Sequence, residues 1–408
     1  MNIKVLWDGG VASALGFAAG GARGGIKMSG EDVGLIVAPN GTTAAGVWTQ
    51  NAVKAAPVWV SAEHISPGET RGIVWNSGNA NCCTGAQGLI DARRMCELAA
   101  SKIGCDPTQI LVCSTGIIGQ PLPMEKIESA LSDLQSGHGD QFSAACARAA
   151  MTTDTVPKHL AAQGEINGQT VTVGGQVKGV GMIGPDMAAM SPQSTLHATL
   201  LAFLTTDARA EKALLQRVLE SAVAKSFNSV TVDGDTSTND SAILLAGGSG
   251  QNIDQSTLAS FQELVDFVCI ELAKKVARDG EGATKLVTIE VEGAKSEADA
   301  QKVALTIANS PLVKTAIFGR DPNWGRIAMA AGRSGVSFDA RYLAIWLGAI
   351  EVFRAGEPIA FDQIQAEAAM SEENLTVKVL LSEGSARWTA WTCDFSYDYV
   401  KINAEYHT

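Results

Sequence analysis

The chain has 408 residues, of which 46% are hydrophobic and 6% are aromatic. This length can bury a large core and suffices for two domains, while the formal net charge of −12 argues against a nucleic-acid-binding protein, which normally presents a basic face. The 42 glycines indicate an α/β protein with many tight turns and close backbone approaches.

The first third of the chain alternates short apolar runs with glycine, asparagine and serine. This pattern predicts strands over residues 33–38, 45–49, 72–75 and 110–113, and helices over residues 89–103 and 127–134. Two polar segments follow strands. Residues 76–81 contain three asparagines, which fit either a turn or a polar cradle, and Ser114-Thr115-Gly116 is predicted to be a turn.

The rest of the chain predicts helices over residues 208–226, 256–278 and 297–308, and a strand with period-2 alternation over residues 285–292. From about residue 286 the pattern returns to strand, helix, strand. We therefore expect a main domain over residues 1–285 and a smaller C-terminal α/β domain over residues 286–408.

The targeting and cysteine patterns indicate a reduced cytoplasmic protein. The N-terminus has no basic segment followed by an apolar one, so no signal peptide is expected, and the apolar run at residues 342–350 is far shorter than the ~20 residues of a membrane span. The eight cysteines are spread out, without a CxxC pair or a Cys/His cluster at metal-ligand spacing. We expect no bound metal, no membrane association and no nucleic-acid partner.

Several segments combine hydroxyls, amides and charges with glycine. A strand that ends in Thr115-Gly116 exposes backbone N–H groups and a hydroxyl together, as an oxyanion hole requires, although Ser-Thr-Gly also forms ordinary turns. Residues 226–241 are dense in Asp, Thr, Ser and Asn, and a solvated hairpin is the plain alternative there. Charged residues lie among glycines at 278–285 and 319–326, where either a carboxylate projects into a cleft or the loop is simply solvated.

Taken together, these segments resemble the ornithine acetyltransferase family of arginine biosynthesis, from about Gly9 to the end of the chain. The resemblance rests on motifs in the family's order, which are NSGNANCCTG (76–85), STGIIGQPLPM (114–124), MTTDTVPK (151–158), KGVGMIGPDMA (178–188), ATLLAFLTTDA (198–208), SFNSVTVDGDTSTND (226–240), RDGEGATK (278–285), GRDPNWGRI (319–327) and YVKINAEY (399–406).

The resemblance implies an αβ-sandwich fold that cleaves itself and uses an N-terminal threonine as the nucleophile. Acetyl transfer from N2-acetylornithine to glutamate would be ping-pong, through an acetyl-threonine, and bifunctional members also accept acetyl-CoA. No cofactor is implied. An α2β2 assembly is implied. A threonine hydroxyl is a poor nucleophile alone, but cleavage frees an α-amine with a pKa of about 8 that can act as its base.

Site residues carried over by the resemblance fall into three roles. Thr115 and Gly116 would form the oxyanion hole, and Lys178 and Glu281 would hold the charged groups of the substrate. The further substrate contacts would be Thr152 or Thr153 of the TTD motif, Asn403 and the C-terminal Thr408.

The nucleophile position departs from the family's pattern. Counting eleven residues from Lys178 reaches Ala189 rather than a threonine, whereas counting back from LLAFLTTDA reaches Thr199, preceded by Ala198. In the first interpretation, about ten residues (189–198) are inserted, cleavage falls between Ala198 and Thr199, a helix follows, and the chains are 1–198 and 199–408. In the second, Ala189 has replaced the nucleophile, and the chain is an uncleaved, inactive relative that binds ornithine.

A rival enzymatic interpretation is an amidase or aminopeptidase with the same self-cleaving fold. It would hydrolyse amides rather than transfer acetyl groups, and the RDGEGATK and YVKINAEY motifs favour the transferase.

Overall fold

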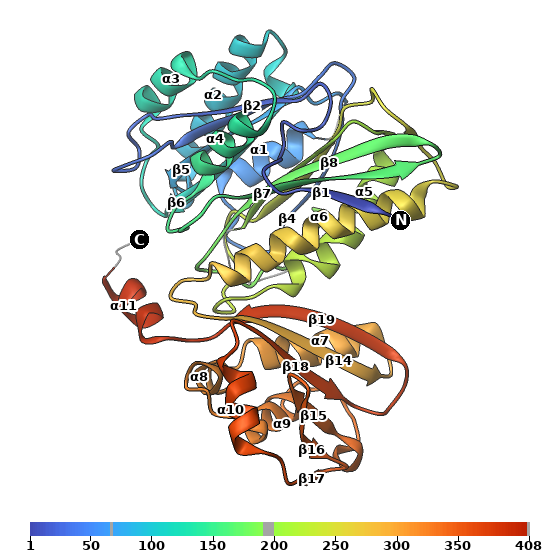
Figure 1. The fold of residues 1–408 in the computed structure, drawn as a ribbon. Helices are drawn as coiled ribbons and strands as arrows, with labels where there is room; N and C mark the ends of the chain where they lie inside the picture. The colour runs from blue at the N-terminus through green and yellow to red at the C-terminus, as the bar shows by residue number, and fades with distance from the viewer. Residues whose placement is uncertain (66–67, 191–199, 406–408) are drawn as a thin grey trace. The chain divides into compact units, whose positions relative to one another are not determined.

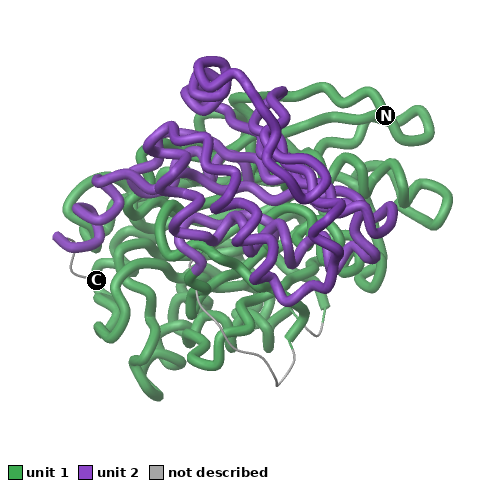
Figure 2. The backbone as a smooth tube through the Cα atoms, turned by 90° about the horizontal axis from the view of Figure 1, so that it is seen from below, with its two compact units in different colours: residues 1–228, 235–272, 408 green, residues 229–234, 273–407 purple. Residues whose placement is uncertain are grey.

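The computed structural model describes residues 1–65, 68–190 and 200–405 (Figure 1). They form two compact units (Figure 2). The first unit comprises the described residues of Met1–Asn228 and Asp235–Leu272, and the second comprises Ser229–Gly234 and the described residues from Ala273 onward. The domain boundary at residues 285/286 and the division into two chains at 198/199 stay predictions.

The first unit is built on two large sheets. One has the strand order β1 (Ile3–Leu6), β7 (Lys158–Ile166), β8 (Gln169–Lys178), β10 (Leu201–Thr206), β12 (Ser241–Ala246), β4 (Thr43–Thr49) and β9 (Met187–Ala188). The other has the order β2 (Ala18–Ala22), β3 (Val33–Val37), β5 (Gly72–Asn79) and β6 (Ile110–Ile117). Two short strands, β11 (Arg209–Ala210) and β13 (Asn252–Ile253), pair separately.

The helices of this unit are α1 (Ala56–His64), α2 (Gly85–Ile103), α3 (Met124–Asp133), α4 (Asp140–Ala150), α5 (Lys212–Lys225) and α6 (Leu258–Arg278), whose last residues belong to the second unit.

The two sheets pack face to face. Trp75 of β5 lies against Phe203 of β10 with ring centroids 4.8 Å apart, and both side chains are fully buried. Val74, between Ile73 and Trp75, points to the opposite face and joins the core under α2 and α3, with Met95 among its neighbours. This alternation is the period-2 geometry of a strand that is covered on both faces.

The outer face of the seven-stranded sheet is covered by α5, which packs on β4 and β12, and by α6, which packs on β8. A Cβ at Gly175 of β8 would lie 2.8 Å from Leu272 and 3.0 Å from Val268 of α6, so the helix approaches the strand closely because position 175 is glycine. Helices, two sheets and helices thus form a layered sandwich, which confirms the predicted α/β class and sandwich.

The segment after position 199 is a strand, not the predicted helix. Leu201–Thr206 forms β10, parallel to β12 and antiparallel to β8, with every residue buried. A strand that is buried on both faces shows no alternation of apolar and polar residues. Periodicity alone therefore does not distinguish it from a buried helix. The predicted helix over residues 208–226 begins only at Lys212, because Arg209 and Ala210 form β11.

The second unit has one mixed sheet, in the order β17 (Glu357–Pro358), β16 (Ile350–Arg354), β15 (Ala344–Leu347), β18 (Asn374–Leu380), β14 (Leu286–Ala294) and β19 (Ala386–Cys393). Its helices are α7 (Glu297–Ala308), α8 (Pro311–Phe318), α9 (Trp324–Gly332), α10 (Gln363–Ser371) and α11 (Tyr397–Glu405). The predicted strand and helix at β14 and α7 are confirmed. Ser296 caps α7 by accepting a hydrogen bond from the Asp299 amide at 3.1 Å.

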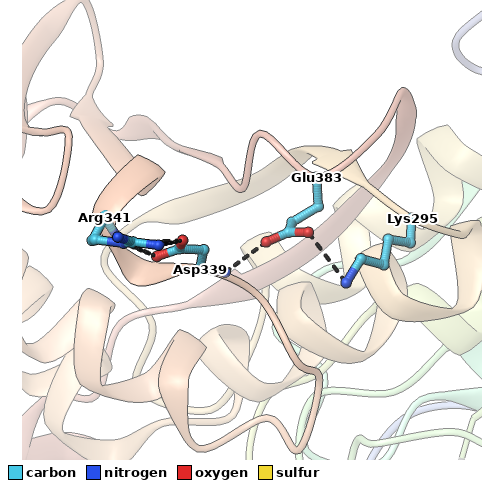
Figure 3. A network of polar contacts seen from close by, with 4 residues as sticks. All are labelled: Lys295, Asp339, Arg341 and Glu383. Carbon is cyan, nitrogen blue, oxygen red and sulfur yellow. Dashed lines mark hydrogen bonds and ion pairs between the residues drawn. The ribbon is translucent and has the colours of Figure 1, made fainter.

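An ion network fixes two loops on the surface of the second unit (Figure 3). Glu383 accepts the Asp339 amide at 2.6 Å and pairs with Lys295 at 3.1 Å, while Arg341 pairs with Asp339 at 2.6 Å. Accepting the Asp339 amide is the main reason that the pKa of Glu383 is lowered. Arg341 and Lys295 are largely exposed, so this network positions loops rather than building a site.

In the part of the chain that the structure describes, no helix is long and apolar enough to cross a membrane.

Candidate active site

The asparagine-rich segment and the Ser-Thr-Gly segment lie side by side as the ends of parallel strands. Ser77 of β5 is in register with Thr115 of β6, and Gly78 with Gly116. The turn predicted at residues 114–116 is wrong, because β6 continues to Ile117. The polar residues remain in strands because their side chains are paired, as in the hydrogen bond from Ser114 Oγ to Asn76 Oδ1 at 2.7 Å.

Gly116 allows these two strands to approach. Its φ is +131°, and a Cβ there would lie 2.3 Å from the carbonyl carbon of Gly78 and 2.5 Å from the Asn79 nitrogen. No other residue fits this backbone conformation and this gap. The strand end that carries Thr115 therefore depends on glycine at position 116.

Lys178, at the end of β8, reaches Thr115. Its Nζ donates a hydrogen bond to Thr115 Oγ1 at 3.2 Å, and both residues are almost completely buried. Lys178 is also directly opposite Leu201 in the antiparallel ladder with β10. The structure thus brings two predicted site residues together next to the strand that follows position 199.

Asp154 connects the TTD motif to Lys178. Its carboxylate accepts the amides of Thr152 and Gly179, both at 2.9 Å, and pairs with the buried ammonium of Lys158 at 2.7 Å. Burial alone would raise the pKa of this carboxyl, but the charges of Lys158 and Lys178 outweigh burial and hold it well below its usual value. Sequence reasoning missed Asp154, although an Asp four residues before a Lys in MTTDTVPK was a usable signal.

Lys27 is a further cation of this cluster that the sequence did not indicate. Its Nζ donates to the Met151 carbonyl at 2.6 Å, and its charge faces Asp32, Asp154 and Lys178. Burial lowers the pKa of Lys27. The residue therefore adds positive charge beside the TTD motif.

Glu281 and Asn403 meet in the second unit. Asn403 Nδ2, on α11, donates to Glu281 Oε2 at 2.9 Å. Gly282 permits the close turn beside them, because its φ is +69° and a Cβ there would lie 2.5 Å from the Tyr399 nitrogen. Two residues that are 122 positions apart are thus paired, as expected if both serve one pocket.

Three of the predicted site positions, Ala198, Thr199 and Thr408, lie outside the described residues, as do the inserted residues 191–197. Thr153 lies beside Thr152 and is half-buried. Ala189 is exposed, directly after β9, which pairs with the end of β4. The choice between Thr199 and Ala189 stays a prediction.

The buried thiols of Cys82 and Cys113 do not offer a competing nucleophile. All eight cysteines are free, and burial raises the pKa of Cys82 to about 11 and of Cys113 to about 12. A thiol with so high a pKa is almost never a thiolate at neutral pH. Among the described residues, no group of three or more His, Cys, Asp or Glu is arranged to hold a metal ion.

Comparison with known proteins identifies close relatives over the whole length. The sequence profile of the ArgJ family matches residues 18–408. The chain is 47% identical over 409 residues to the "Arginine biosynthesis bifunctional protein ArgJ" of Gloeobacter violaceus, with 98% of each chain covered. It is 45% identical over 407 residues to the protein of the same name from Symbiobacterium thermophilum, covering 98% of this chain and 99% of that protein.

Among solved structures, the chain is similar to the crystal structure of the ArgJ protein of Bacillus halodurans. Sequence identity is 41% and the TM-score is 0.48, over 50% of this chain and 97% of that chain.

Proposed function

The chain belongs to the ArgJ family, and from that premise we propose that it transfers the acetyl group of N2-acetylornithine to glutamate through an acetyl-threonine at Thr199. It is an acyltransferase of arginine biosynthesis. The observation that carries the proposed mechanism is the contact between Lys178 and Thr115, which puts an ammonium and a hydroxyl next to the strand that follows residue 199.

Each half-reaction moves one acetyl group and balances its protons. The α-amine of Thr199 takes the hydroxyl proton as Oγ1 attacks the acetyl carbonyl, and the C–N bond to ornithine breaks as the leaving amine receives that proton. The α-amine of glutamate then attacks the acetyl-threonine ester and loses a proton to the α-amine of Thr199, and that proton passes to Oγ1 of Thr199 as the ester C–O bond breaks.

Thr115 and Gly116 are assigned to the oxyanion of both tetrahedral intermediates. Because Thr115 Oγ1 accepts a hydrogen bond from Lys178, its own O–H remains available to donate. The nearby ammonium strengthens that donor and favours negative charge at the same point. Lys178, Glu281, Asn403, Thr408 and the TTD threonines are assigned to substrate binding.

We also propose how the chain matures and assembles and which acetyl donors it uses. Cleavage between Ala198 and Thr199 gives chains 1–198 and 199–408, which assemble as α2β2 in the cytoplasm. Acetyl-CoA is a second acetyl donor for glutamate, and no cofactor is used.

Intact-mass measurement and N-terminal sequencing of the purified protein test the proposal first. We expect two chains, one beginning Thr-Leu-Leu-Ala-Phe. One uncut chain after long incubation, with ornithine binding but no transfer, would instead favour Ala189 as a lost nucleophile.

The second step measures acetylornithine turnover with and without glutamate. Formation of acetylglutamate supports the transferase, whereas release of acetate at the same rate without glutamate would identify an amidase.

A further inference from the structure

A buried carboxyl group lies directly before β12. Asp240 is completely buried, and its Oδ1 accepts a hydrogen bond from the backbone amide of Leu200. Its Oδ2 is also buried and has no hydrogen-bond partner among the described residues. Burying a carboxyl group with an unpaired oxygen is costly, so its presence beside the start of β10 calls for a function.

The neighbouring residue Asn239 binds the ends of β5 and β6, and β6 carries the assigned oxyanion donors. Its Nδ2 donates to the carbonyl of Ser114 at 2.8 Å and to that of Ala80 at 2.7 Å. Ser114 directly precedes Thr115. The adjacent side chains of Asn239 and Asp240 therefore hold two places. Asn239 holds the strand end that precedes Thr115, and Asp240 holds the backbone amide of Leu200.

The backbone around this pair is also fixed. The Asp240 carbonyl accepts the Thr49 amide at 2.9 Å, and the Ser241 amide donates to the Leu200 carbonyl at 3.0 Å. Leu200 is thus held through its amide by Asp240 and through its carbonyl by Ser241. Burial raises the pKa of the Asp240 carboxyl well above its usual value.

We propose that Asp240 is a positioning residue of the acetyl transfer. Through its hydrogen bond with the Leu200 amide, it fixes the residue that directly precedes β10 relative to the strand end that Asn239 binds. The inference rests on the proposed function, because it requires Thr199 to be the nucleophile. A reacting group displaced by about 1 Å loses roughly a hundredfold in rate, so a fixed amide next to the nucleophile has a direct kinetic consequence.

Asp240→Ala tests the proposal, with Asp207→Ala as the matched control. Asp207, just after the other end of β10, is also a mostly buried carboxyl that accepts a backbone amide, that of Thr172 at 3.0 Å. The kcat is calculated per enzyme molecule that can be acetylated at Thr199, so that misfolded protein does not lower the value. We expect Asp240→Ala to lower kcat about a hundredfold with KM changed less than threefold, and Asp207→Ala to keep kcat within about twofold.

Conservative variants complete the test. Asp240→Asn keeps an oxygen acceptor for the Leu200 amide and should restore kcat to within about tenfold of wild type. If Asp240→Ala does not fold, Asp240→Glu replaces it, because the extra methylene moves the carboxyl out of line with the amide. Wild-type kcat in Asp240→Ala or Asp240→Glu, or an equal loss in Asp207→Ala, overturns the proposal.

The wild-type protein and the Asp240 variants distinguish failure of the acetyl transfer from failure of the positioning role. If wild-type protein does not cleave before Thr199 or does not transfer acetyl groups, the proposed function fails whatever residue 240 does. If wild type is active and the Asp240 variants match the control, only the positioning role fails.

Discussion

The ammonium of Lys178 donates a hydrogen bond to the hydroxyl of Thr115 across 3.2 Å, although 63 residues separate them in the chain. The contact joins the last residue of β8 to the end of β6, which belong to different sheets. Because both residues are buried, the contact operates in a low-dielectric environment, where charge stabilisation is strong.

Thr115→Val should lower kcat about 100- to 1,000-fold with a small effect on KM, since loss of one oxyanion donor has that magnitude. The measurement is steady-state acetyl transfer on cleaved enzyme. Thr205→Val is the control, because the Thr205 hydroxyl is also buried and bonded, to the Val11 carbonyl at 2.8 Å. Equal kcat values in the two variants would remove Thr115 from the mechanism.

Gly116→Ala should be far more damaging than Gly119→Ala. Both glycines have positive φ, +131° and +83°, but a Cβ at 116 meets the Gly78 backbone at 2.3 Å, whereas nothing lies within 4 Å of one at 119. Thermal unfolding and activity per folded protein measure the difference. Similar melting temperatures and activities in both variants would show that the close strand approach at Gly116 is dispensable.

Asp154→Asn should lower the free energy of unfolding at pH 7 by about 3–5 kcal/mol, because the buried ammonium of Lys158 then loses the carboxylate with which it pairs. The folded-state pKa of Asp154 lies below the unfolded value of about 3.9, so its stabilisation is complete above about pH 4 and is lost as the pH falls through the folded pKa. Chemical denaturation at several pH values should show the wild-type and variant stabilities converging in acid.

Asp266→Asn is the control for that experiment, since the pair of Asp266 with Lys225, at 2.8 Å, is partly exposed. Its effect at pH 7 should stay below about 1 kcal/mol. A loss as large as that of Asp154→Asn would mean that burial does not set the strength of these pairs.

Thr199→Ala should give one uncut chain without acetyl transfer, because both cleavage and acylation need the hydroxyl. Thr199→Ser should still be cleaved. Gel analysis and N-terminal sequencing follow cleavage, and Ser194→Ala and Thr195→Ala serve as controls that should behave as wild type. Full activity in Thr199→Ala would end the assignment of this residue as the nucleophile.

Asn403→Asp should raise the KM for N2-acetylornithine about tenfold or more, a change that corresponds to about 1.4 kcal/mol of binding. The new carboxylate would face Glu281 in place of the amide that now donates to it at 2.9 Å. Asn374→Asp makes the same charge change at an exposed position of the second unit and should leave KM as in wild type. An unchanged KM in Asn403→Asp would remove Asn403 from substrate binding.

Several elements were predictable because their signals are local. The alternation in β14 follows from one face buried and one partly exposed, and the limits of α7 follow from the Ser296 cap and the acidic first turn. The strand β10 and the extension of β6 through Ser-Thr-Gly were not predictable in this way. In both places, burial and distant hydrogen-bond partners override the local preference.

The sequence by itself determined the family, the α/β class and the positions of the motifs. Each of these depends only on which residues occur and in what order along the chain. Only the tertiary structure decided that Lys178 meets Thr115, that Asp154 binds Gly179 and that Asp240 holds the Leu200 amide. Each of these contacts joins segments 25 to 63 residues apart. Their geometry depends on strand register and sheet packing, which are fixed by the whole core rather than by any local pattern.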